Sequence, residues 1–137
     1  MSRKKARDLL FVLTFETLFI EPENSESLEQ ILNSINLEEE NLNFIKENYP
    51  KILENKAELE NIISRNLSEK FSFDRLFKID LAILMLATHE LMFNKTNSIK
   101  IVVNEAVELA KKYSTDNSYS FINGVLANII KNEKITD

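Results

Sequence analysis

The most apolar stretch of this chain, from Ile79 to Phe93, has hydrophobic residues at eleven of its fifteen positions. Leu, Met and Ala favour the α-helix, and neither Gly nor Pro interrupts them. The pattern predicts a helix that is apolar on nearly every side, which must be buried. A membrane span would need roughly 20 uninterrupted apolar residues, whereas this run is broken by His89 and Glu90. We therefore expect a central helix around which the rest of the chain packs, and no membrane segment.

Residues 3–20 are predicted to form the first helix, ended by Pro22, and two apolar stripes run along it. One stripe comprises Ala6, Leu9, Leu10, Leu13 and Ile20, and the other comprises Phe11, Val12, Phe15, Leu18 and Phe19. The stripes point in different directions, so that one faces the core and the other faces either more core or a partner protein. The pattern favours more core, because apolar stripes usually serve packing.

Five further segments show the helical spacing of apolar positions, namely residues 28–35, 38–49, 59–67, 99–112 and 118–130. Ser27 and Gln30 form a capping-box pattern at the start of the first segment, and Pro50 should end or kink the second. Gly124, the only glycine in the chain, falls inside the last segment. A glycine there costs about 1 kcal/mol relative to alanine, so we expect it to allow a close approach to the central helix.

Composition narrows the fold class to all-α. One glycine and two prolines among 137 residues are too few for the turns of a sheet-rich protein. The length and the 44% hydrophobic content suit one domain, residues 1–137. With no cysteine and a single histidine, the chain offers neither a disulfide nor a zinc ligand set, and no cofactor is expected. It also lacks a nucleophile paired with a base and a phosphate-binding glycine loop, so no enzyme activity is predicted.

The net charge of −5 argues against a nucleic-acid partner until it is divided along the chain. Residues 1–20 carry four basic and two acidic side chains, residues 21–60 carry three and eleven, and residues 61–137 carry ten and nine. A phosphate backbone could therefore dock on the two ends of the chain. The basic cluster that opens the first helix is either a solvated terminus or a nucleic-acid contact. No signal-peptide cleavage pattern follows it, so we expect a cytoplasmic protein.

Several segments together resemble the NusB family of bacterial transcription antitermination factors. The resemblance covers nearly the whole chain and is strongest from Phe71 to Leu126. Its main carriers are FSFDRLFKIDLAILMLATHEL, then VVNEAVELAKKY and, after a short spacer, FINGVL, in the order and spacing of the family. Near the N-terminus, RKKARDLL followed by TFE resembles the family's arginine-rich start and its aromatic signature.

This resemblance implies a compact fold of about seven helices in two helical subdomains, and a role without catalysis. Members of the family pair with NusE, a ribosomal small-subunit protein that also acts in transcription. The pair binds the boxA element of nascent ribosomal RNA. Together with other Nus factors, it helps RNA polymerase to pass terminators in ribosomal RNA operons.

Positions that match the family's motifs give the candidate site. Arg3, Lys4, Lys5 and Arg7 match the basic N-terminus, and Tyr113, Asn117 and Phe121 match aromatic and polar positions beside the last loop; the resemblance implies that these seven bind RNA. Cations along phosphates and aromatic faces under splayed bases are what single-stranded RNA requires. Phe15 and Asp80 match positions that bind NusE, Asp80 as an acid able to pair with a base on the partner.

Departures from the family pattern, above all at Met85, and two alternative functions also follow from the sequence. Met85 stands where members commonly carry arginine, so one cation near the binding surface is expected to be missing. The chain could instead be a helical protein-binding scaffold or homodimer without RNA binding, joined through its first helix. The same module also occurs at the N-terminus of ribosomal RNA cytosine methyltransferases, but this chain has no catalytic cysteine. Steep loss of RNA affinity with salt would distinguish an RNA-binding protein from a scaffold.

Overall fold

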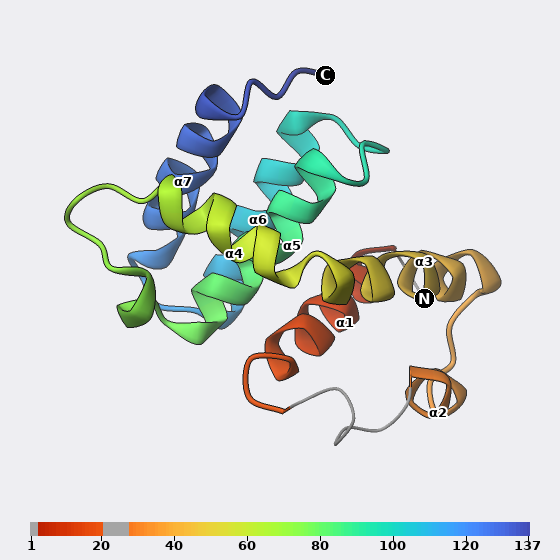
Figure 1. Ribbon diagram of the computed structural model, residues 1–137. Coiled ribbons are helices and arrows are strands. Elements are labelled where there is room, and N and C mark those ends of the chain that lie inside the picture. Colours follow the sequence, from red (N-terminus) through yellow and green to blue (C-terminus); the bar gives the residue numbers. More distant parts are fainter. Residues whose placement is uncertain (1–2, 21–27) are drawn as a thin grey trace.

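The computed structural model describes residues 3–20 and 28–137, and this part of the chain contains seven α-helices and no strand (Figure 1). The helices are α1 (Arg3–Glu16), α2 (Leu28–Asn33), α3 (Glu39–Glu54), α4 (Lys56–Arg65), α5 (Lys78–Met92), α6 (Ile99–Tyr113) and α7 (Ser118–Asn132), with a 3-10 turn at Phe73–Arg75. The predicted all-α class and the implied number of helices are confirmed.

Helix α5 lies in the centre of the fold and contacts α1, α3, α4, α6 and α7 (Figure 1). Every residue from Asp80 to Leu91 is buried. Each fully buried Leu or Ile contributes about 1.5–3 kcal/mol, so this helix holds much of the hydrophobic stabilisation. The predicted central helix is confirmed, and it starts and ends one residue earlier than the apolar run.

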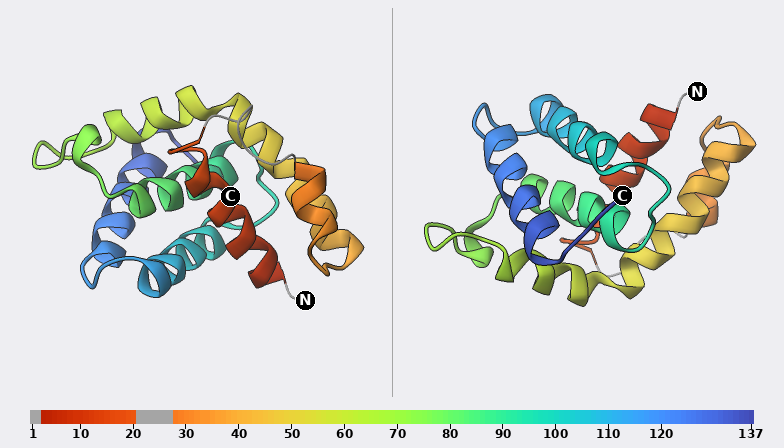
Figure 2. Two further views of the ribbon diagram at one scale, coloured as in Figure 1. Left: turned by 90° about the horizontal axis from the view of Figure 1, so that it is seen from below. Right: turned by 90° about the horizontal axis from the view of Figure 1, so that it is seen from above.

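The helices form two groups. Helices α1 to α3 make one group, and α4 to α7, which include the central α5, make the other; both views of Figure 2 show α3 leading into α4 along one side of the molecule. Only Asn55 separates these two helices. This arrangement agrees with the two helical subdomains that the resemblance implies.

Helix α1 ends four residues earlier than predicted. Thr14 Oγ1 donates a hydrogen bond to the Leu10 carbonyl at 2.8 Å, and Thr17 Oγ1 donates to the Thr14 carbonyl at 2.6 Å. Such hydroxyl-to-backbone bonds compete with the helical ladder, and residues 17–20 form a turn instead. Pro22 and the Ser27 cap lie outside the described residues.

Helix α3 continues through Pro50, so of the two predicted outcomes, an end or a kink, the proline does not end the helix. A proline inside a helix costs about 3 kcal/mol through a lost hydrogen bond and a clash. The side chains of Ile45 and Ile52, one on each side of Pro50, are both fully buried. Their burial offsets that cost, since each is worth about as much as the proline takes away.

Gly124 does not mark a close approach between helices, so that prediction is wrong. A Cβ atom added to Gly124 would meet no atom within 4 Å, and the residue is exposed on α7. The side of α7 that packs on the core is formed instead by Ile122, Val125, Leu126 and Ile129. Helix packing therefore leaves the glycine unexplained.

Candidate nucleic-acid interface

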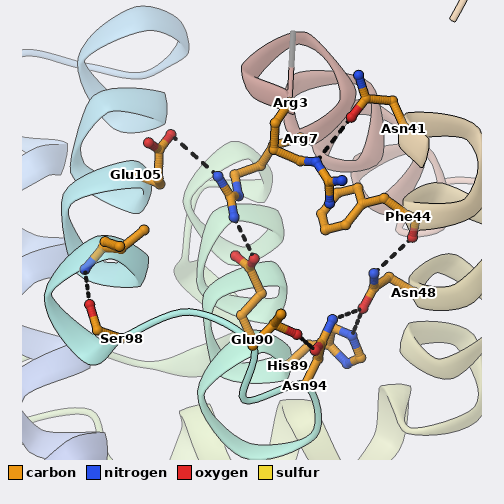
Figure 3. Close-up of polar contacts among 12 residues, drawn as sticks. Arg3, Arg7, Asn41, Phe44, Asn48, His89, Glu90, Asn94, Ser98 and Glu105 are labelled. Carbon is orange, nitrogen blue, oxygen red and sulfur yellow. Dashed lines mark hydrogen bonds and ion pairs between the residues drawn. The ribbon is translucent and has the colours of Figure 1, made fainter. Parts of the chain in front are cut away.

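Arg7 is the one predicted RNA-binding cation that the structure places inside the protein. Its Nη2 atom lies 2.8 Å from Glu90 Oε1, and its Nη1 atom lies 3.7 Å from Glu105 Oε2 (Figure 3). The side chains of Arg7 and Glu90 are only 6% and 4% exposed. Arg7 therefore joins α1 to α5 and α6 as a buried ion pair, and the expectation that it meets RNA phosphates directly is wrong for this conformation.

The other three cations of the N-terminal cluster, Arg3, Lys4 and Lys5, are exposed. Arg3 Nε donates a hydrogen bond to Asn41 Oδ1 at 3.0 Å, and its guanidinium carbon lies 4.3 Å from the centre of the Phe44 ring (Figure 3). These contacts tie the start of α1 to α3. Phosphate binding by the cluster would rely on the outer nitrogens of Arg3 and on the two lysines.

A second group of cations and aromatic rings lies where α6 ends and α7 begins. It comprises Lys111, Lys112, Tyr113 and Tyr119, all exposed, and we name it the α6–α7 ridge. The Nζ atom of Lys111 lies 5.3 Å from the centre of the Tyr119 ring, and that of Lys112 lies 5.0 Å from the Tyr113 ring. Each cation thus stands beside an aromatic face, the combination that single-stranded nucleic acids bind.

Lys112 is also held by an acid on α1. Its Nζ donates to Asp8 Oδ2 at 2.6 Å, and the Tyr113 hydroxyl donates to the same oxygen at 3.4 Å. The hydrogen bond to Asp8, with a smaller contribution from Tyr113, raises the pKa of Lys112 above its usual value. The lysine therefore keeps its charge throughout the physiological pH range.

Asp80 is buried, although it was expected to be exposed to a partner. Its carboxylate accepts hydrogen bonds from Ser114 Oγ at 2.5 Å and from Ser118 Oγ at 3.0 Å, and the residue is 3% exposed. Ser118 Oγ lies a further 2.9 Å from Ser114 Oγ and 2.8 Å from Thr115 Oγ1. The Asp80 carboxylate on α5 thus binds a serine at each end of the α6–α7 loop and holds this loop in place.

Asn117 and Phe121 lie together on a groove of about 830 Å³. Its walls are the 68–77 segment on one side and the first half of α7 on the other, and we name it the α7 groove. Phe71 stands against Phe121 with ring centres 4.6 Å apart and the planes tilted by 56°. Phe77 and Gly124 also line the groove. The groove is larger than the hollow of about 300 Å³ that Lys4 lines together with residues of α6.

Phe15 belongs to a row of aromatic rings on α1 and the turn that follows it. Its ring centre lies 6.3 Å from that of Phe11 and 5.0 Å from that of Phe19, the latter pair edge to face. Phe15 is half-buried, whereas Val12, Phe19 and Ile20 are exposed. We name this row, with Val12 and Ile20, the α1 face. Val12 and Phe19 of the second apolar stripe are thus not covered by the described residues, so the prediction that this stripe packs into the core holds only in part.

Met85 lies in the core and is fully buried. The methionine side chain at position 85 therefore does not reach the surface in this fold, and its apolar character suits its surroundings on α5.

His89 is also internal. Its Nε2 lies 2.8 Å from Asn48 Oδ1, an oxygen that also accepts a bond from Asn94 Nδ2 at 2.6 Å (Figure 3). Burial, and to a lesser extent the charge of Lys51, lowers the pKa of His89 to about 4, so the ring is neutral at pH 7. Within residues 3–20 and 28–137, no group of three or more acidic or histidine side chains could hold a metal ion. None of the helices in these residues has the length and apolar character that a membrane span requires.

The nine predicted site residues thus fall into separate places. The structure brings Asn117 and Phe121 together on the α7 groove and places Tyr113 beside Lys112 on the ridge. Sequence reasoning did not select Lys111, Lys112 and Tyr119, because ordinary ion pairing with nearby acids on the helix surface already explains the two lysines. It also missed Phe71 and Phe77, which approach α7 only through the fold. The sequence signal that could have identified Phe71 and Phe77 is their aromatic character.

Comparison with known proteins matches these features to one family. The NusB family model matches residues 1–131. A transcription antitermination protein NusB from Clostridium novyi is 44% identical over 133 residues, covering 96% of this chain and 99% of the relative. A solved NusB structure from T. maritima superposes with a TM-score of 0.81 at 36% identity, covering 96% of this chain and 92% of that one. A structure of antitermination factors NusB and NusE in complex with dsRNA gives a TM-score of 0.80 at 26% identity, covering 95% and 96%.

Proposed function

The chain belongs to the NusB family of transcription antitermination proteins, and we propose from this premise that it binds the boxA element of nascent ribosomal RNA together with NusE. In this role it helps RNA polymerase, with other Nus factors, to read through terminators in ribosomal RNA operons. The function is one of binding, without a catalytic step or a cofactor. Nascent RNA of this kind is made in the bacterial cytoplasm, and we place the protein there.

The observation that carries the proposal is the α6–α7 ridge beside the α7 groove. Lys111 and Lys112 offer charge to phosphates, and Tyr113 and Tyr119 offer flat faces next to those charges. Phe121 and Asn117 supply an aromatic edge and an amide on the other side of the same loop. Single-stranded RNA is bound in this way, by a basic track with stacking platforms along it.

For NusE we propose the α1 face. Phe15, the predicted contact, is half-buried at its centre, and Phe19 is 61% exposed at its end. An exposed aromatic cluster of this kind is typical of a protein–protein contact. The other predicted contact, Asp80, is buried, so we propose that it supports RNA binding indirectly through the α6–α7 loop.

The same face supports the second candidate function. Two copies of this chain could bury Val12, Phe19 and Ile20 against each other, which would make the protein a homodimer or a scaffold without RNA. The two functions predict different hydrodynamic behaviour: a homodimer is twice the mass of one chain at micromolar concentration, and added NusE dissociates it if both occupy one surface.

The first test of RNA binding by the ridge is its salt dependence. Lys111→Gln is expected to make the plot of log affinity for a boxA-like RNA against log salt less steep by about 0.7, since one phosphate contact of a single strand is lost. Fluorescence anisotropy over a series of KCl concentrations measures this slope. Lys46→Gln, which removes an exposed lysine on α3, is the matched control and should leave the slope unchanged. Equal slopes for the wild type and Lys111→Gln would place the RNA elsewhere.

A further inference from the structure

Gly124 has no structural reason to be glycine. It lies in the middle of α7, where glycine destabilises a helix relative to nearly every other residue except proline. Its backbone does not adopt a positive φ angle, and a Cβ atom added to it would meet nothing within 4 Å. Neither backbone conformation nor packing therefore explains the residue. The remaining explanation is the open space next to Gly124.

That space is the α7 groove, and its walls are unusually aromatic for a surface. Phe77 is 61% exposed and Phe71 is 46% exposed, although side chains of this size are normally buried. Phe121 packs against Phe71 across the end of the groove. The volume of about 830 Å³ lies within the range of small-molecule pockets, roughly 300–1,000 Å³.

Polar groups at the rim suggest what the groove could hold. Asn117 occupies the N-cap position of α7 but makes no capping hydrogen bond with its side chain, so its amide can bond to a ligand. Arg75 lines the opposite wall and is exposed. Aromatic faces, one amide and one guanidinium are the groups that bind a flat heterocycle attached to a phosphate.

We propose that the α7 groove takes one unstacked base of the bound RNA. The base lies against the ring of Phe77 or Phe71 with its hydrogen-bonding edge toward Asn117, and its phosphate lies toward Arg75. Gly124 keeps the floor of the groove open, because any side chain there would occupy the volume of the base. This inference rests on the proposed function and assigns Phe71, Phe77, Arg75 and Gly124 to it.

The test fills the groove and separates filling from unfolding. Gly124→Leu is expected to keep or raise Tm, because leucine favours a helix more than glycine does and the space is open. The same variant is expected to weaken binding of a boxA-like RNA in the presence of NusE by tenfold or more. Asn123→Leu, at the exposed neighbouring position outside the groove, is the matched control and should stay within twofold of the wild type.

A second measurement identifies the base. Abasic nucleotides are placed one at a time along the RNA, and one position is expected to cost the wild type roughly ten- to hundredfold in affinity. That cost should vanish in Gly124→Leu and shrink in Phe77→Ala, because the two changes remove the same contact.

Three results would overturn the inference. Wild-type affinity in Gly124→Leu would show that nothing enters the groove, and undiminished abasic costs in that variant would place the base elsewhere. If Gly124→Leu lost NusE binding but kept RNA binding, the groove would be assigned to the protein partner. A wild-type protein that does not bind this RNA even with NusE would instead remove the proposed function itself, and the inference with it.

Discussion

Replacing Arg7 with methionine is expected to lower the free energy of unfolding by about 3–5 kcal/mol, the largest single effect that we predict for stability. The reason is Glu90, which is 4% exposed and would be left charged and buried without its partner. Urea unfolding followed by circular dichroism measures the loss. RNA affinity measured on the folded protein at low temperature should stay within a few-fold of the wild type.

Two further variants decide how this result is read. Lys4→Met, one turn away on the exposed side of α1, should change stability by no more than about 0.5 kcal/mol. The double variant Arg7→Met with Glu90→Met should recover most of the lost stability, because it removes both buried charges. A stable Arg7→Met protein with much weaker RNA binding would contradict the ion-pair assignment and restore Arg7 as a direct contact.

Replacing Asp80 with alanine is expected to weaken RNA binding by roughly ten- to hundredfold, because Asp80 holds the α6–α7 loop in place. Its carboxylate holds Ser114 and Ser118 through two hydrogen bonds, and a bond to a charged group is worth about 1.5–3 kcal/mol. Without it, the α6–α7 loop samples other conformations, and affinity falls with the fraction of molecules whose loop is in place. Isothermal titration with a boxA-like RNA measures the change.

Ser118→Ala removes the other side of the same contact and serves as the matched variant. Its effect and that of Asp80→Ala should be less than additive, because both disrupt one network. Affinity for NusE should change little in either variant. If Asp80→Ala instead abolished NusE binding and left RNA binding intact, the acid would be a partner contact after all, and the loop would be positioned by other groups.

Helix positions could be predicted where a single segment determines them. The run from Ile79 to Phe93 is so apolar that burial follows from composition alone, and the structure places it within one residue. The pattern was less decisive where local rules compete: the threonines of α1 end that helix early, and α3 with its buried isoleucines continues past Pro50, where the sequence predicted an end or a kink. The pattern in one segment does not show which of two opposing contributions to the free energy of folding is larger.

The candidate site was harder to predict than the fold, because its geometry depends on distant partners. From the sequence alone Arg7 is expected to be a surface cation, but the fold places Glu90, 83 positions away, beside it. Asp80 reads as an exposed helix-start acid until the serines of a loop 34 and 38 positions later cover it. Gly124 reads as a packing glycine unless its surroundings are known. Residue type suggested a chemistry for each position, but exposure could be decided only by the fold.

The most direct test of the central claim is the coupling between RNA and NusE on this protein. We would measure the affinity for a boxA-like RNA with and without saturating NusE, and the affinity for NusE with and without saturating RNA. We predict that each ligand increases the affinity for the other by the same factor, since linkage is reciprocal, and that the factor is of the order of tenfold or more. NusE binding with no RNA affinity in either state would contradict this prediction and leave a protein-binding scaffold.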